Sequence, residues 1–198
     1  SLEELKRSPD RELRKRTQIV QQDPTETFDP RWRIERALAD PLLVHQLLPS
    51  HLIQGRVREL LETVALDPSV LTQKPRDLGP GSLQRLAIAR ALATDPEFLV
   101  LDEPTSALAP DDRKRILQLL RRLRDKLGMA YLFISHDLSS IASICDRVAV
   151  MYLGQIVEIG AADDILRRPI HPYTEALIAA YLEEKPSVRR VDRTIKMQ

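Results

Sequence analysis

The chain has 198 residues, 43% of them hydrophobic, so it can bury one substantial core with at most a small second lobe. Thirty basic residues against 29 acidic ones leave a formal net charge of +1. The net charge therefore gives no indication of binding to nucleic acid or to an acidic membrane. The single cysteine, Cys145, excludes an internal disulfide and a cysteine-rich metal site and is typical of a reducing compartment.

We expect the chain to be soluble and cytosolic, because no apolar run approaches the roughly 20 residues that span a bilayer and no signal peptide is visible. It begins with Ser1 rather than Met, so a processed, trimmed or fragmentary N-terminus is one interpretation. Ser1–Arg16 is highly charged and predicts a helix tail or a solvated connector. Thr17–Val20 predicts a short strand, which the polar turn Gln21–Pro24 ends.

Between Arg31 and Asp67 the pattern becomes helical. Apolar residues recur there at helical spacing: Ile34, Leu38, Leu42, Leu43, Val57, Leu60, Leu61 and Val64. Pro41, Pro49 and Pro68 punctuate the stretch. We interpret it as a small helical lobe inserted between two parts of an α/β core.

A glycine-containing loop, Leu78–Arg85, then leads into a helix whose predicted N-cap is Ser82. One apolar face of this helix is expected to consist of Leu83, Leu86, Ala87, Ala91 and Leu92. A glycine-rich loop at a helix N-terminus presents free N–H groups and the positive end of the helix dipole to an anion. Taken alone, however, the segment favours a simple turn before a helix.

The stretch Phe98–Leu101 is apolar without interruption and predicts a strand buried on both faces. Asp102 and Glu103 follow at its carboxyl end, and Pro104 stops the strand. In open α/β sheets ligands bind at that end. An acidic pair there is costly unless a cation lies opposite, and Mg²⁺ with a nucleotide phosphate is the usual solution. For the acidic pair alone, a loop after a core strand is the simpler alternative.

Pro110–Leu127 predicts a basic amphipathic helix, and Tyr131–Ile134 predicts the next buried strand. His136 follows the carboxyl end of that strand, on the same edge of the sheet as the acidic pair. An imidazole there can contact a γ-phosphate, and a structural hydrogen bond is the alternative. The remaining predicted elements are a helix over Leu138–Cys145, a hairpin of Val148–Met151 and Gln155–Ile159 about Gly154, short helices over Ala161–Leu166 and Tyr173–Leu182, and a loose polar tail over Glu183–Gln198.

Taken in order, these segments resemble the ATPase subunit of an ATP-binding cassette (ABC) transporter over nearly the whole chain. Five segments carry the resemblance: Gln21–Pro24 as the Q-loop with Gln22 as its glutamine, Leu78–Arg85 in place of the Leu-Ser-Gly-Gly-Gln signature, Phe98–Glu103 as Walker B with the catalytic glutamate, Ser106–Leu108 as the start of the D-loop, and Ile134–Asp137 as the switch-histidine loop. His171–Leu177 and Phe28–Arg31 further resemble the oligopeptide, dipeptide and nickel importer subfamily.

The resemblance implies an α/β fold, a P-loop NTPase-like core with a mostly parallel sheet flanked by helices and an inserted helical subdomain. It also implies that the N-terminal part of that fold is missing. The implied domains are the end of the core lobe with the Q-loop (1–29), the helical subdomain (30–77), the ATPase core (78–168) and an importer-type C-terminal extension (169–198). The implied cofactors are ATP and Mg²⁺.

The resemblance also assigns roles to residues. Glu103 would polarise the attacking water and His136 would contact the γ-phosphate. Asp102 would hold Mg²⁺ through water, while Gln22 would share the metal and couple the site to the membrane partner. The signature positions complete the nucleotide-binding set: Gly79, Gly81 and Ser82. Phosphoryl transfer needs mainly positioning and charge stabilisation, so these groups suffice without a covalent intermediate.

The implied partners are integral-membrane permease subunits, a second ABC ATPase subunit and, indirectly, a solute-binding protein, with no nucleic acid. The implied location is the cytoplasm, peripherally on the inner face of the cell membrane. The solute stays undefined, because in this family specificity lies in the binding protein and the permeases.

The sequence departs from the family at the phosphate-cradling loop, because no Gly-x-x-x-x-Gly-Lys-Ser/Thr occurs anywhere in it. In the family this Walker A loop lies upstream of the segments seen here, so the chain is similar to the family minus its amino-terminal lobe. We therefore expect the chain alone to have negligible ATP affinity and to be inactive.

The signature and the D-loop depart as well. Gly79 replaces the signature serine, Pro80 deletes one backbone N–H, and Ser82 replaces the glutamine, while Ala109 stands at the D-loop aspartate. In the family, two subunits pair head to tail and each offers these segments to its partner's site. The pattern predicts an asymmetric heterodimer, in which one site hydrolyses ATP and the other mostly holds it.

Three interpretations stay open. The first is a fragment or truncated form of a peptide-type importer ATPase. The second is a non-catalytic paralogue that acts as a dimerisation or regulatory module. The third, an ABC protein of DNA repair or translation, gains little support from a net charge of +1 and from the importer-type C-terminal segment.

Overall fold

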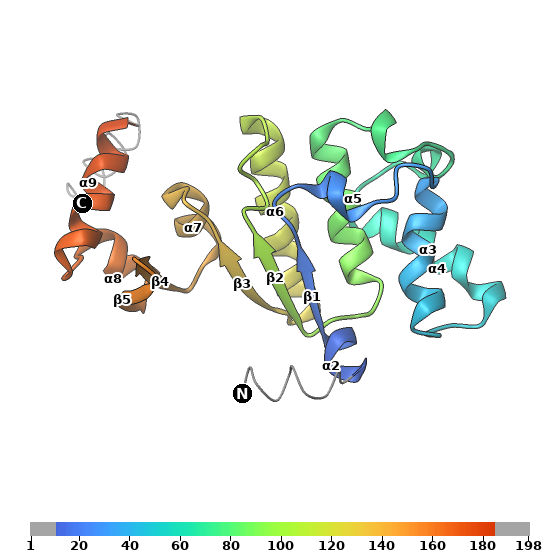
Figure 1. The fold of residues 1–198 in the computed structure, drawn as a ribbon, viewed down its shortest axis with the longest axis horizontal. Helices are drawn as coiled ribbons and strands as arrows, with labels where there is room; N and C mark the ends of the chain where they lie inside the picture. Colours follow the sequence, from blue (N-terminus) through green and yellow to red (C-terminus); the bar gives the residue numbers. More distant parts are fainter. Residues whose placement is uncertain (1–10, 185–198) are drawn as a thin grey trace. The chain divides into compact units, whose positions relative to one another are not determined.

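Three parallel strands form the sheet of the first of two units, residues 1–135 (Figure 1). The computed structural model describes residues 11–184. The strands lie in the order β1, β2, β3, and their bounds are Thr17–Val20, Phe98–Asp102 and Ala130–Ile134. The predicted strands are thereby confirmed, and so is an α/β fold with a parallel sheet.

The helices of the first unit cover one face of this sheet. On that face Leu99 and Leu101 are fully buried. Tyr131, the register partner of Leu99, donates a 2.9 Å hydrogen bond from its hydroxyl to the carbonyl of Leu120 in α6 (Pro110–Leu127). The α6 helix therefore contacts β3.

The opposite face of the sheet is exposed. Its apolar residues Ile19, Leu132 and Ile134 are 55%, 49% and 44% exposed, and Val100 is only half-buried. The prediction that β2 is buried on both faces is therefore wrong for this second face. The prediction of a buried strand for β3 is also wrong, because none of its residues is buried. An apolar run cannot tell a strand covered on two sides from one covered on a single side, because coverage depends on distant elements.

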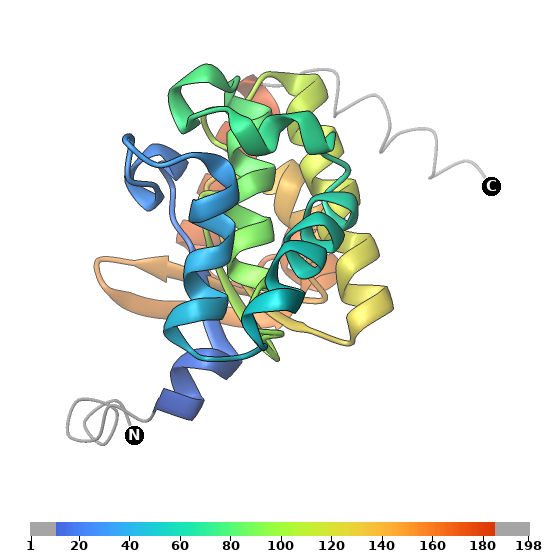
Figure 2. The same ribbon diagram turned by 90° about the vertical axis from the view of Figure 1, so that its right-hand side faces the viewer.

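The central helix α5 (Pro80–Leu92) is buried on nearly all sides, not on a single apolar face as expected. The helices α3 (Ile34–Val44) and α4 (Ser50–Thr63) pack beside it, and β1 and α6 also contact it (Figure 2). The predicted N-cap Ser82 is also wrong, because the N-cap is Gly79, three residues earlier, and α5 begins at Pro80. Pro80 explains the early start, since its fixed φ and missing N–H suit the first helical position.

The apolar positions expected for α3 and α4 are mostly buried. The fully or nearly fully buried residues are Ile34, Leu38, Leu42, Val57, Leu60, Leu61 and Val64. Leu43 is the exception and is exposed. Pro49 is the N-cap of α4 and Pro68 begins a 3₁₀ helix, but Pro41 lies inside α3 and does not end it. A helix tolerates an internal proline when packing holds both sides, and buried Leu38 and Leu42 flank it here.

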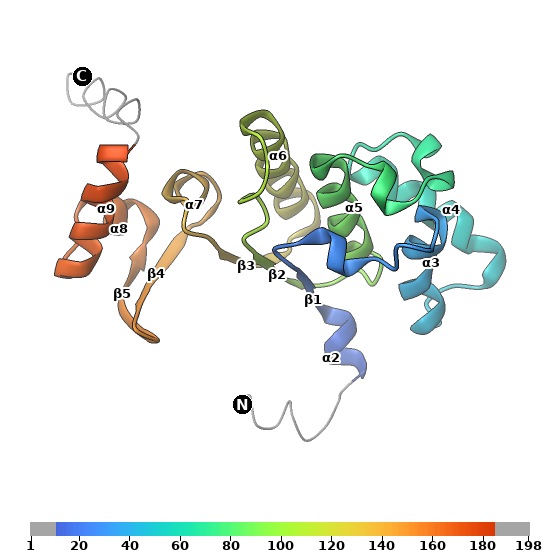
Figure 3. The same cartoon turned by 45° about the horizontal axis from the view of Figure 1, so that its top comes forward.

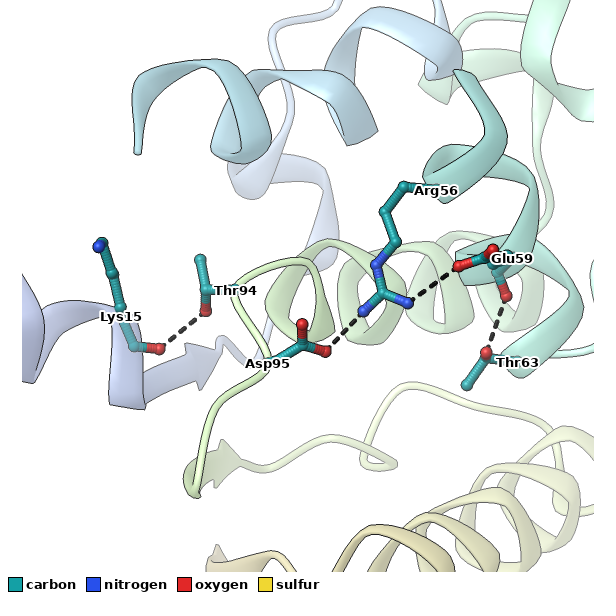
Figure 4. A network of polar contacts seen from close by, with 6 residues as sticks. All are labelled: Lys15, Arg56, Glu59, Thr63, Thr94 and Asp95. Carbon is teal, nitrogen blue, oxygen red and sulfur yellow. Dashed lines mark hydrogen bonds and ion pairs between the residues drawn. The ribbon is translucent and has the colours of Figure 1, made fainter. Parts of the chain in front are cut away.

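A polar network ties the helices to the start of the sheet (Figure 4). Arg56 of α4 donates to Asp95 at 2.6 Å and to Glu59 at 3.2 Å. Beside Asp95, the hydroxyl of Thr94 donates to the carbonyl of Lys15, just before β1, at 2.8 Å. Exposed ion pairs of this kind contribute little stability, but together they fix the loop after α5.

The second unit, residues 136–198, contains an antiparallel hairpin and three helices within its described part (Figure 3). Its elements are α7 (Leu138–Ile144), β4 (Arg147–Tyr152), β5 (Gln155–Ala161), α8 (Ala162–Arg167) and α9 (Pro172–Glu184). Leu153 and Gly154 both have positive φ, 47° and 78°, as a tight two-residue hairpin turn requires. The predicted hairpin and short helices are confirmed.

The remaining described elements are short: α2 (Arg11–Arg16) and the 3₁₀ helices Pro24–Thr27, Pro68–Thr72 and Pro75–Asp77. Most of the predicted N-terminal connector and of the predicted C-terminal tail, residues 1–10 and 185–198, lie outside the described residues. Between residues 11 and 184, no helix combines the length and hydrophobicity that crossing a bilayer needs.

Candidate functional site

The carboxyl ends of β1 and β2 bring three predicted site residues to one edge of the sheet. Val20 lies opposite Leu101 in the parallel register. Asp102 is the last residue of β2, and Glu103 and Gln22 each lie two residues beyond this matched pair. Gln22 is exposed, while Asp102 and Glu103 are half-buried. The first unit therefore places one amide and two carboxylates where open α/β sheets bind ligands.

Asp102 belongs to the exposed face of the sheet. Side chains alternate along a strand, so Asp102 shares a face with Val100 and not with buried Leu101. Its register partner on β3 is the exposed Ile134. The carboxylate of Asp102 thus lies at the edge of the uncovered apolar face.

Glu103 lies in a strained turn. Its φ is 47°, in the left-handed region that a residue with a Cβ seldom adopts, at a cost of about 1–3 kcal/mol. Its N–H donates to the carbonyl of Ile134 at 2.9 Å, and its carbonyl accepts from the backbone and the hydroxyl of Ser106. The hydroxyl of Ser135 donates to Glu103 Oε2 at 3.4 Å. The contacts with Ile134 and Ser106 therefore fix the backbone of Glu103, and Ser135, directly after β3, contacts its carboxylate.

The glycine segment before α5 presents two features. Pro80 is the first helical residue and has no N–H, and Leu83 donates its N–H back to the carbonyl of Gly79. The helix therefore offers the amides of Gly81 and Ser82 at its N-terminus. Ser82 lies within the first turn of α5 and is not its N-cap.

Gly81 is buried against α6. A Cβ at this position would lie 2.5 Å from the carboxyl carbon of Asp112 and 2.7–2.8 Å from its oxygens. Asp112 lies in the first turn of α6, three residues after Ala109, which is the N-cap of that helix. A carboxylate therefore lies beside the N-terminal amides of α5, a neighbour that the sequence analysis did not identify.

His136 is the first residue of the second unit and is exposed. It precedes Asp137, which is buried and is the N-cap of α7. The carboxylate of Asp137 accepts hydrogen bonds from the hydroxyls of Ser139, Ser140 and Tyr181. The partners of Asp137 could not be predicted, since Tyr181 lies 44 residues further along the chain.

The carboxyl of Asp29, which lies close to Gln22 along the chain, has a lowered pKa. The side chain and the backbone N–H of Arg31 donate to it, and these bonds lower the pKa of the Asp29 carboxyl to about 2. Phe28 beside it is buried. The turn after Gln22 is therefore fixed by one buried ring and one charged hydrogen-bond pair.

The donor set at the sheet edge fits magnesium. Mg²⁺ prefers oxygen ligands, and the two predicted metal residues, Asp102 and Gln22, supply a carboxylate and an amide oxygen. In the described part of the chain, no group of three or more His, Cys, Asp or Glu side chains could hold a metal ion. A magnesium ion here would therefore take further ligands from phosphate and water.

A cavity of about 500 Å³ lies elsewhere in the first unit. Leucines of the α3–α4 region line it together with the ion pair of Arg56 and Asp95. None of the predicted site residues lines this cavity. It is therefore separate from the edge of the sheet that carries Asp102 and Glu103.

Comparisons with known proteins identify the family. The family described as ABC transporter matches residues 2–106, and the one described as oligopeptide/dipeptide transporter, C-terminal region, matches residues 157–198. The oligopeptide transport ATP-binding protein OppF of Streptococcus mutans is 40% identical over 179 residues, which cover 90% of this chain and 58% of that protein. The glutathione import ATP-binding protein GsiA of Escherichia coli K12 is 45% identical over 183 residues, 92% of this chain and 29% of that protein.

The chain thus spans less than two thirds of the length of each of these relatives. The first family match alone covers more than half of the chain, and the second covers its carboxyl-terminal segment. The parallel sheet with helices packed on it agrees with that assignment. The chain belongs to the ABC transporter family.

Proposed function

We propose that this chain carries the hydrolytic half of an ATP site in an ABC importer, and that the importer takes up peptides or related small solutes. The placement of Gln22, Asp102 and Glu103 at one sheet edge carries the proposal. The C-terminal match to an oligopeptide/dipeptide transporter region, and the relatives named for oligopeptide and glutathione transport, support the solute class.

In the proposed mechanism Glu103 polarises the water that attacks the γ-phosphate of ATP. Its strained turn and its hydrogen bonds to β3 keep the carboxylate positioned before the reaction, which is what phosphoryl transfer requires. Asp102 and Gln22 would hold Mg²⁺, and His136 would contact the γ-phosphate. Bound Mg²⁺ would neutralise charge on the phosphates.

The remaining half of the site is proposed to come from outside these residues. The sequence contains no phosphate-cradling Gly-x-x-x-x-Gly-Lys-Ser/Thr, and the exposed face beside Asp102 offers an apolar surface for a further element. The proposed partners are permease subunits, a second ATPase subunit and, indirectly, a solute-binding protein. The proposed location is the inner face of the cell membrane. Residues 30–77 are proposed to form the helical subdomain.

The second ATPase subunit is proposed to differ from this one. Pro80 offers no N–H at the start of α5, and the carboxylate of Asp112 beside Gly81 disfavours a phosphate there. Ala109 lacks the carboxylate expected in the D-loop. These features weaken what this chain offers to a partner's site, while Glu103 and Asp102 serve its own.

The decisive experiment replaces Glu103 by glutamine in the assembled transporter. We expect phosphate release to fall at least about hundredfold, the scale of a lost general base, while ATP is still bound. Glu97→Gln is the matched control, because Glu97 is an exposed glutamate paired with Arg16 and lies at the opposite end of β2. Unchanged hydrolysis in Glu103→Gln would favour the alternative of a non-catalytic module.

The asymmetry is tested by restoring the signature. Gly79→Ser together with Pro80→Gly should increase the number of ATP molecules hydrolysed per transporter in a single turnover. Gly55→Ser is the control, because Gly55 lies on α4 with open space beside it. An unchanged number of hydrolysing sites would contradict the asymmetric arrangement.

A further inference from the structure

A tyrosine on the last described helix reaches the turn that contains the predicted switch histidine. The hydroxyl of Tyr181 in α9 donates to Oδ1 of Asp137 at 3.0 Å and accepts the backbone N–H of Ser139 at 3.1 Å. All of these residues belong to the second unit. One hydroxyl thus bridges a side chain and a backbone group of the turn that directly follows His136.

Asp137 is a buried carboxylate that needs such partners. It is only 8% exposed, and a buried charge is costly unless hydrogen bonds compensate it. The hydroxyl of Ser139 donates to both carboxylate oxygens at 2.8 and 3.0 Å, and that of Ser140 donates to Oδ2 at 2.7 Å. Tyr181 adds a donor from outside the turn and α7.

Tyr181 also replaces a missing helix cap. Asp137 is the N-cap of α7 and has the extended backbone of a cap, φ −87° and ψ 99°, yet its side chain makes no cap hydrogen bond. An N-cap side chain ordinarily accepts the N–H of the second or third helical residue. Here Ser139 is that second residue, and its N–H is accepted by Tyr181. The first turn of α7 is therefore capped from α9.

We propose that Tyr181 is a positioning residue for His136. By fixing the carboxylate of Asp137 and the amide of Ser139, it fixes the backbone of the residue that follows His136 and hence the direction of the imidazole. His136 is exposed, so burial does little to orient it. The inference rests on the proposed contact between His136 and the γ-phosphate.

Through Tyr181, the C-terminal segment would take part in the ATPase cycle. Tyr181 lies within residues 157–198, which match the oligopeptide/dipeptide transporter C-terminal region. The segment before α9 is itself attached to β5, because Glu158 accepts the N–H groups of Ile170 and His171 at 2.8 and 3.1 Å. A displacement of α9 would therefore reach the histidine turn through the hydroxyl of Tyr181.

The test removes only that hydroxyl in the assembled transporter. Tyr181→Phe should lower kcat for ATP hydrolysis about tenfold, the effect of one lost hydrogen bond to a charged group, with KM for ATP unchanged. Tyr173→Phe is the matched control on the same helix, because its ring stacks on Tyr152 and its hydroxyl is not part of the Asp137 network. It should leave kcat unchanged.

Asp137→Asn, alone and combined with Tyr181→Phe, shows whether the tyrosine acts through Asp137. The two substitutions should lower kcat by less in combination than the product of their separate effects, as expected for residues in one network. Multiplicative effects, or a Tyr181→Phe enzyme that behaves like Tyr173→Phe, would overturn the inference.

His136→Ala separates this inference from the function on which it rests. A lowered kcat in His136→Ala together with a normal Tyr181→Phe enzyme would refute the role of Tyr181 alone. An unchanged kcat in His136→Ala would refute the proposed role of the histidine and, with it, the positioning role.

Discussion

Val20 of β1 lies directly opposite Leu101 of β2 in a parallel register. Because of this pairing, the polar segments that follow the two strands leave the sheet side by side. A shift of the register by one residue would exchange the faces occupied by Asp102 and by its neighbours. Because Leu99 and Leu101 are buried on one face of β2, Asp102 lies on the opposite, exposed face.

The first prediction concerns nucleotide binding by the isolated chain. The sequence lacks the glycine-rich lysine loop that anchors nucleotide phosphates, so Asp102 and Glu103 have too few partners to hold Mg-ATP. Calorimetric titration of the purified chain with Mg-ATP at micromolar concentrations should give no binding heat, and Asp102→Asn should behave identically. Saturable binding that Asp102→Asn abolishes would contradict the proposal.

The exposed face of the sheet should make the isolated chain bind hydrophobic dyes. Ile19, Leu132 and Ile134 lie together on that face, and apolar patches of this kind mark surfaces that associate. Leu132→Thr keeps a strand-favouring residue and should lower the fluorescence of bound 1-anilinonaphthalene-8-sulfonate. Leu127→Thr is the control, because Leu127 is equally exposed, at 51% against 49%, but lies at the end of α6. Equal losses in both variants would show that the sheet face is not the site.

A methyl group at Gly81 should destabilise the first unit. Its Cβ would lie 2.5 Å from the carboxyl carbon of Asp112, so the aspartate must move, and we expect a loss of about 1 kcal/mol in the free energy of unfolding. Gly79→Ala is the control, since no atom lies within 4 Å of its Cβ position. Urea titration of both variants measures the difference.

The same clash can be relieved from the other side. In an Asp112→Ala background the carboxylate is gone, so Gly81→Ala should no longer cost stability. A loss of the same size in both backgrounds would show that Gly81 is required for a reason other than its contact with Asp112.

Local patterns in the sequence predicted much of the fold. The helix Pro110–Leu127 is confirmed to the residue, because proline marks its start and Gly128 ends it in the left-handed conformation. Pro80 marks the start of α5 in the same way, and this position of the proline predicts Gly79 and not Ser82 as the N-cap. The uncovered face of β3 could not be predicted, since burial depends on elements far away in the chain.

Some features of the candidate site could likewise be predicted from the sequence, and others could not. Parallel strands bring their carboxyl ends to one edge, so the neighbourhood of Gln22, Asp102 and Glu103 could be predicted from the strands alone. The positive φ of Glu103 has no signal in the sequence, since a residue before proline is ordinarily extended. The bond between Tyr181 and Asp137 joins residues 44 apart and depends on the packing of the second unit.

Gln84 should be replaceable by methionine with a gain in stability. Its side chain is 2% exposed in the middle of α5, and its Nε2 has no hydrogen-bond partner among the described residues. A buried donor without an acceptor costs about 1–3 kcal/mol, so Gln84→Met should raise the free energy of unfolding by about 1 kcal/mol. Gln84→Glu, which buries a carboxylate at the same place, should lower it. A loss of stability in Gln84→Met, measured by urea titration, would contradict the prediction.

The last prediction concerns the turn after Gln22. Arg31 holds the pKa of the Asp29 carboxyl at about 2, below the usual value of about 3.9. A carboxyl whose pKa is lowered by folding stabilises the folded state above its unfolded pKa, and this contribution is lost as the pH falls from about 4 to about 2. Carbon-13 NMR titration of the Asp29 carboxyl should therefore show a midpoint near pH 2. Arg31→Lys cannot form the paired hydrogen bonds and should move the midpoint upward, whereas Arg33→Lys, two residues further on, should leave it unchanged. Equal midpoints in wild type and Arg31→Lys would show that the guanidinium does not hold this turn.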